Sequence, residues 1–248
     1  MSRVLAVFAF LFTFAAAVAG AVAVSGAEPA NQAGAKGGTP AKPLHWEAND
    51  LFIETNATDG DAGLQMNLDA EHWKRFELRD PKGRLLADVN ARNRLRGVGL
   101  SELFFEAAEP PFTKFPFSRF KRRFPEGKYT FTGETTSGRE LVGSDTLSHV
   151  VPDGPKVTFP TEGAEVDPSG LRVTWEPVTR PTGVKIVSYQ VIVNQGDREM
   201  SAYLPPSATS LTIPAEFLVS GTKGGGEILA REQSGNQTIT EIPSFTTR

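Results

Sequence analysis

The sequence predicts a mainly β protein with two β-sandwich domains, the first carrying a short two-helix insertion. Short runs of alternating apolar and polar residues recur from about residue 44, and turn-forming Asp, Gly and Pro separate them. One stretch, residues 97–125, breaks this pattern with apolar residues at helical spacing. The 248 residues contain no cysteine, so each domain must be stabilised by a packed core without disulfides.

The first predicted domain spans residues 44–152 and contains three pairs of strands. Leu64, Met66 and Leu68 alternate with polar residues, which is the period of a half-buried strand. The predicted pairs are residues 51–56 with 63–69, 73–79 with 84–89, and 128–134 with 140–147. Short strands at this spacing are typical of a sandwich, and an immunoglobulin-like sandwich is expected here, as in the domain that follows.

Within this domain, residues 97–125 are predicted to form two short amphipathic helices. In the first helix the apolar residues at helical spacing are Leu100, Leu103, Phe104 and Ala107. In the second, Phe117, Phe120 and Phe124 share one face, and Arg119, Arg122 and Arg123 occupy the opposite one.

This Phe- and Arg-rich stretch is the candidate partner surface of the chain. The residues assigned to it are Phe112, Phe115, Arg119, Arg122 and Arg123. Such a face would suit an anionic surface, for example a cell-wall polymer or lipid headgroups. The alternative is structural, with the phenylalanines packed on the sandwich. The basic face would then pair with Glu102, Glu106 and Glu109 or stay in water.

A candidate metal site lies in the turn before residue 63. Asp59 and Asp61 stand beside flexible glycine backbone, where carboxylate and carbonyl oxygens would suit Ca²⁺. A helix–loop–helix calcium site would need a further carboxylate that residues 66–68 do not offer. The alternative is a solvated Asp-Gly turn between two strands.

Residues 153–248 carry an ordered set of strand motifs. They are Pro155–Pro160, Leu171–Pro177 with Trp175, Ile186–Val193 with Tyr189, Thr209–Pro214, and a closing hairpin from Glu227 to Thr246. In this order and spacing they resemble a fibronectin type III domain. The resemblance implies an immunoglobulin-like β-sandwich that acts as a spacer or a protein-binding surface. Where that family usually has a tyrosine, this chain has Gly224-Gly225-Gly226, which predicts a mobile loop.

The beginning of the chain predicts export. Residues 1–27 resemble a signal peptide, with Arg3, then an uncharged apolar stretch, then small residues at the exit. Residues 28–43 are rich in Gly, Ala, Pro and Lys and are predicted to be a flexible linker. The protein is therefore expected to be secreted or periplasmic. Alternatively, an uncleaved segment anchors it in a membrane. Residues 51–150 also resemble the front part of uncharacterised exported bacterial proteins.

Composition and motifs favour a non-catalytic protein. The net charge of −3 gives no electrostatic argument for a nucleic-acid partner, and no cofactor motif is found. His45, His72 and His149 lie in separate segments without metal-ligand spacing, and no catalytic residue is assigned. Asn56 and Asn236 begin glycosylation sequons that we take as chance matches. The prediction is a binding or structural module for a protein or envelope polymer. A pure spacer or an extracellular hydrolase remains the alternative.

Overall fold

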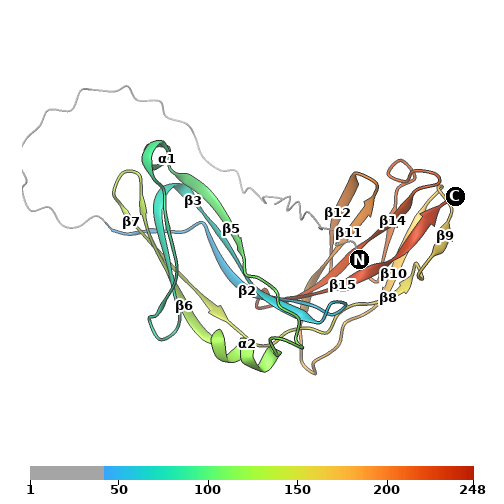
Figure 1. Ribbon diagram of the computed structural model, residues 1–248, viewed down its shortest axis with the longest axis horizontal. Coiled ribbons are helices and arrows are strands. Elements are labelled where there is room, and N and C mark those ends of the chain that lie inside the picture. The colour runs from blue at the N-terminus through green and yellow to red at the C-terminus, as the bar shows by residue number, and fades with distance from the viewer. Residues whose placement is uncertain (1–41) are drawn as a thin grey trace, which may run out of the picture. The chain divides into compact units, whose positions relative to one another are not determined.

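The structure is a computed structural model that describes residues 42–248, and it is mainly β (Figure 1). The predicted signal peptide and most of the predicted linker lie outside the described residues. The predicted fold class is confirmed, because β-strands packed as sandwiches surround two separate cores. In this part of the chain, no helix has the length and apolar character needed to cross a membrane.

The first sandwich is one sheet folded over on itself. Its strands are β1 (Leu44–His45), β2 (Ala48–Asn56), β3 (Asp61–Arg79), β4 (Leu85–Asn90), β5 (Leu100–Glu106), β6 (Gly127–Thr135) and β7 (Glu140–Leu147). The first half of β3 pairs with β2 and β5, and its second half pairs with β4 and β6. Between the halves the register shifts, and His72 adopts a positive φ of 54°. This irregularity lets β2 lie beside β7, so the two halves enclose a core.

Aromatic side chains fill this first core. Trp46 meets Trp73 and Phe76 edge to face, with ring centroids 5.8 and 5.9 Å apart. Tyr129 and Phe131 are fully buried beside them. Such large side chains supply the apolar burial that a domain without disulfides needs.

Two short helices form, but the first begins before the predicted insertion of residues 97–125 and is not where the pattern predicted it. The helices are α1 (Asn93–Val98) and α2 (Phe117–Arg123). The predicted helix over Leu100–Ala107 is wrong, because residues 100–106 form strand β5 on the edge of β3. Leu103 and Phe105 pack against the core with strand alternation, and pairing with an open sheet edge outweighs the helical spacing. The separate strands predicted at 63–69 and 73–79 are likewise one strand, β3.

The second sandwich has a three-stranded sheet facing a larger one. Its strands are β8 (Lys156–Phe159), β9 (Ala164–Val166), β10 (Leu171–Glu176), β11 (Ile186–Gln195), β12 (Arg198–Leu204), β13 (Ser210–Ile213), β14 (Lys223–Glu232) and β15 (Gln237–Thr247). One sheet has the order β13-β10-β8, and the other contains β12-β11-β14-β15. Trp175 and Tyr189 pack together in the core, with centroids 5.5 Å apart. This fold is fibronectin type III-like, as predicted.

The triple glycine does not form the mobile loop that the sequence predicted. Gly224, Gly225 and Gly226 lie within β14 and pair with β11. A Cβ at Gly226 would collide with the carbonyl of Ile192, and one at Gly224 would collide with the ring of Phe245. The glycines are therefore explained by close packing around a strand.

The two sandwiches share a continuous sheet. Strands β2 and β15 pair in parallel over Glu54–Asn56 and Gln237–Ile239. Asn236 is fully buried at this joint, where its Oδ1 accepts a hydrogen bond from the Ile53 N–H at 2.8 Å. Its Nδ2 donates to the carbonyls of Ser148 and Val150 at 3.0 and 2.7 Å. The second sequon is thus inaccessible in the folded chain. Asn236 instead links three segments by hydrogen bonds at this joint.

Candidate functional site

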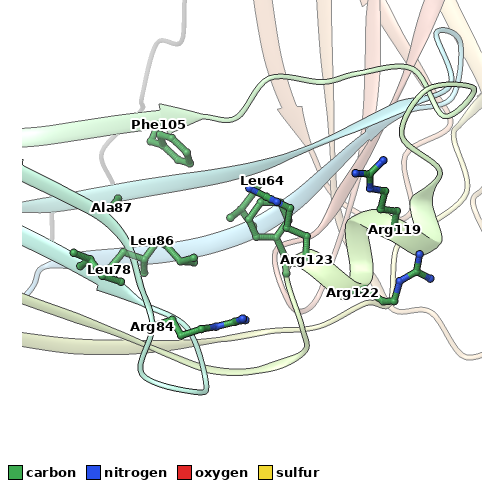
Figure 2. A pocket seen from close by; sticks show the side chains of 11 residues that line it. Leu64, Leu78, Arg84, Leu86, Ala87, Phe105, Arg119, Arg122 and Arg123 are labelled. Carbon is green, nitrogen blue, oxygen red and sulfur yellow. The ribbon is translucent and has the colours of Figure 1, made fainter.

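A groove of about 650 Å³ opens between the first sandwich and α2 (Figure 2). Its apolar lining comes from Leu64, Leu78, Leu85, Leu86, Ala87, Phe105 and Phe124. Leu85 and Leu86 are 47% and 40% exposed, so apolar surface is left in contact with water on β4. A concave, mostly apolar site of this size matches the usual dimensions of a small-ligand pocket.

Four arginines stand at this groove: Arg84, Arg119, Arg122 and Arg123. Figure 2 shows Arg119 and Arg122 on α2, across from the apolar side chains of the strands. Arg84 is neutralised by Asp80, with 2.6 Å between the guanidinium and the carboxylate. Within residues 42–248, no carboxylate forms an ion pair with Arg119, Arg122 or Arg123. The rim therefore presents positive charge that the described chain does not balance.

In the structure the phenylalanines of the candidate partner surface are partly buried, whereas its arginines are exposed. Phe112 and Phe115 are half-buried and pack against the first core. Phe120 is buried at 3% exposure, so the Phe face of α2 contributes to the sandwich. Arg119, by contrast, is exposed and lies 5.1 Å from the ring centroid of Phe115. The basic face is what remains available to a partner.

A second cluster lies on the other face of the same sheet. Oxygens of Glu54 on β2, Glu106 on β5 and Glu109 just after β5 lie within 4.8 Å of one another. Glu106 pairs with Gln65 across the β3–β5 ladder, and Gln65 donates to Glu54 at 2.5 Å. Because successive strand residues point to opposite faces, this cluster lies opposite the Leu64 and Phe105 of the groove.

The carboxylates of the cluster are held in an environment that disfavours their charge. Burial raises the pKa of Glu109 to about 8, and the neighbouring Glu54 and Glu106 push it the same way. Burial also raises the pKa of Glu54 to about 7, against the effect of hydrogen bonds from Gln237 and Gln65. Within residues 42–248, no lysine or arginine forms an ion pair with Glu54, Glu106 or Glu109.

Asp59 and Asp61 are brought near this cluster without being its centre. The Oδ1 of Asp61 is buried with no hydrogen-bond partner, while Asp59 accepts a hydrogen bond from Asn56 at 3.2 Å. Both charges add to the raised pKa of Glu109. Metal binding by Asp59 and Asp61 stays a prediction, and their position now suggests a supporting role.

Sequence reasoning missed the cluster of Glu54, Glu106 and Glu109 because they come from segments that only the sheet brings together. It considered Glu106 and Glu109 as ion-pair partners of the α2 arginines, and no such pair forms among residues 42–248. One signal was present in the sequence, since Glu54 is a charged residue inside the apolar run that begins at Leu51. Leu85 and Leu86 were likewise read only as strand residues. Their adjacency puts an apolar side chain on both faces of β4, which indicates an apolar surface outside the core.

Comparisons of this chain with known proteins give matches among solved structures only. No family model matches the chain, and no curated protein matches it. Among solved structures, it is similar to the fibronectin type III domain of human collagen α-1(XX), with 21% identity and a TM-score of 0.30. That match covers 40% of this chain and 89% of the collagen domain.

Two longer matches also consist of fibronectin type III domains. A two-domain segment of chicken tenascin is 15% identical, with a TM-score of 0.28, over 79% of this chain and 99% of that one. The FN1–FN3 domains of chicken CNTN1 are 12% identical, with a TM-score of 0.31, over 84% of this chain and 66% of that one. The fibronectin type III-like description of the second sandwich rests on its strand order.

Proposed function

We propose that this chain is an exported, non-catalytic binding module of the cell envelope or secreted fraction, and that its ligand is an anionic lipid. One observation carries the proposal, namely the apolar groove with unpaired arginines on its rim (Figure 2). An acyl chain would cover the exposed Leu85 and Leu86, and an anionic head group would meet the guanidinium groups of α2. Export rests on the signal-like residues 1–27.

The charge and the shape of the groove support this ligand over a neutral one. Arg119, Arg122 and Arg123 project from a single helical turn and a half, so one head group can be reached by more than one of them. A neutral apolar ligand would leave these charges uncompensated, and a polar anion would leave the leucines in water. A molecule with both parts satisfies both.

The test is a titration of the full chain with a fluorescent long-chain fatty acid, followed by displacement with lysophosphatidylglycerol. The combined change Arg119→Gln, Arg122→Gln and Arg123→Gln is expected to weaken binding by about tenfold or more, since each charge-assisted bond contributes about 1.5–3 kcal/mol. Wild-type affinity is expected to fall with added salt.

The matched control removes the same charge elsewhere in the first domain. Arg92, Arg94 and Arg96 are all exposed in and beside α1. Changing all three to Gln gives a control with the same net charge as the test variant. This control is expected to alter affinity by no more than about twofold. Equal losses in both triple variants, or equal binding of a long-chain alcohol, would reduce the groove to a non-specific contact and overturn the proposal.

The hydrogen-bonded joint supports a second proposal, that the chain is a structural spacer. Parallel pairing of β2 with β15 and the buried Asn236 favour a fixed angle between the two sandwiches. Residual dipolar couplings from both sandwiches are then expected to fit one alignment tensor. Two unrelated tensors would refute a rigid spacer and leave the groove proposal untouched.

A further inference from the structure

We infer that Glu54, Glu106 and Glu109 form a binding site for a divalent cation, with Ca²⁺ as the ion that the oxygens suit best. Three carboxylates whose oxygens lie within 4.8 Å of one another can all reach a single ion at the 2.3–2.6 Å typical of Ca²⁺. Mg²⁺ is smaller and prefers to keep its water ligands, so a protein cage of carboxylates suits it less.

A buried amide points to a ligand independently of the three acids. Gln65 is fully buried, and its Nε2 donates to Glu54 at 2.5 Å while its Oε1 has no hydrogen-bond partner. Its ladder partner across the sheet is Glu106. Leaving a buried oxygen unsatisfied destabilises the folded chain, and a cation between these groups would supply the missing partner. Amide oxygens are ordinary ligands of Ca²⁺.

The backbone holds Glu109 over the cluster. The segment after β5 is fixed at both ends, because Ala107 donates to the Leu64 carbonyl at 2.9 Å and Phe112 donates to the Gly60 carbonyl at 2.8 Å. Glu109 then lies directly over Gly63, where a Cβ would come within 2.9 Å of the glutamate Cγ. Glycine at this position makes the space that the third carboxylate occupies.

The second sandwich completes the support of the site. Gln237 on β15 donates a hydrogen bond to the other oxygen of Glu54. Glu54 is 2% exposed, so its carboxylate is oriented by two amides from two different strands. Without a cation, three acids with mutual repulsion and raised pKa values are gathered in one place, which destabilises the folded chain.

The experiment measures Ca²⁺ binding to the full chain by calorimetry after treatment with chelator. One ion per chain is expected, with a dissociation constant on the order of 10⁻⁴–10⁻³ M, as in extracellular modules. Glu109→Gln and Glu106→Gln are each expected to weaken binding at least tenfold. Glu102→Gln, an exposed position on the same strand, is the matched control and is expected to leave binding unchanged.

Thermal unfolding provides a readout that misfolding cannot imitate. In chelator at pH 9, where Glu109 with its pKa of about 8 is mostly ionised, Glu109→Gln is expected to melt above wild type, because it removes one of the repelling charges. In Ca²⁺ the wild-type midpoint is expected to rise, whereas that of Glu109→Gln stays in place. No Ca²⁺-dependent heat or shift in the wild type would overturn the inference. Loss of binding in Asp59→Asn but not in Glu109→Gln would overturn it in favour of the turn.

Discussion

Replacing Asn236 with alanine is expected to cost the folded chain about 2–4 kcal/mol. The change removes three hydrogen bonds at the joint of the sandwiches. The Ile53 N–H is fully buried, so leaving it without an acceptor costs about 1–3 kcal/mol. The carbonyls of Ser148 and Val150 lie in partly exposed residues and can be rehydrated, so they add only about 1 kcal/mol together.

A second substitution at the same position separates the donor from the acceptor role. Asn236→Asp keeps an oxygen for the Ile53 N–H but turns the donor into a carboxylate that faces two carbonyl oxygens. It is expected to destabilise the protein at pH 7 at least as much as alanine does. Asn194→Ala, at an exposed position on β11, is the control and should stay within about 0.5 kcal/mol of wild type.

Urea unfolding gives the free energies, and amide hydrogen exchange gives the location. In wild type the Ile53 amide is expected to be protected through Asn236, and Asn236→Ala should release that protection while central strand amides such as Phe131 keep theirs. A loss below about 1 kcal/mol together with retained protection at Ile53 would refute the assigned role of Asn236.

Three further changes test charge, backbone and packing. Burial, reinforced by the charge of Glu241, raises the pKa of Glu227 from 4.5 to about 7. The folded state therefore holds a proton that the unfolded state releases, and the free energy of unfolding should fall as pH rises between those values. Glu227→Gln should flatten that fall when urea unfolding is measured at each pH. Gly99→Ala should lower the free energy of unfolding by more than about 1 kcal/mol in the same assay, because the φ of Gly99 is 87° and a Cβ there would come within 2.9 Å of the β3 backbone. Gly97→Ala, where a Cβ would meet open space, is the control and should not show this loss. Similar values for both variants would contradict the reasoning. Phe120→Ala should cost about 3–5 kcal/mol in chemical unfolding, and a loss below about 1 kcal/mol would mean that α2 does not pack on the core.

Much of the fold could be predicted because the relevant signals are local. The alternation of Leu64, Met66 and Leu68 reports a strand directly, and all three are buried in β3. The Phe face of α2 could also be predicted, since helical spacing places Phe120 toward the core. Leu100–Ala107 satisfied the helical template and still formed a strand, because the open edge of β3 is a partner that spacing within one segment does not reveal.

The joint and the acidic cluster could not be predicted, because both depend on contacts between distant segments. Asn236 and Ile53 are separated by 183 positions, and only the pairing of β2 with β15 brings them together. A buried asparagine and a sequon asparagine look the same in sequence. Glu106 and Glu109 offered only possible ion-pair partners for the arginines until β5 placed them beside Glu54.

The alternation of β3 and β5 explains how one sheet can serve both proposed ligands. Leu64 and Phe105 face the groove, while the neighbouring Gln65 and Glu106 face the acidic cluster. A one-residue slip of β5 against β3 would exchange these faces, burying a carboxylate among leucines and exposing a phenylalanine to the acids. The register is therefore under constraint from both sides of the sheet. Substitutions on one face can test its ligand without removing the other, which keeps the two proposals experimentally independent.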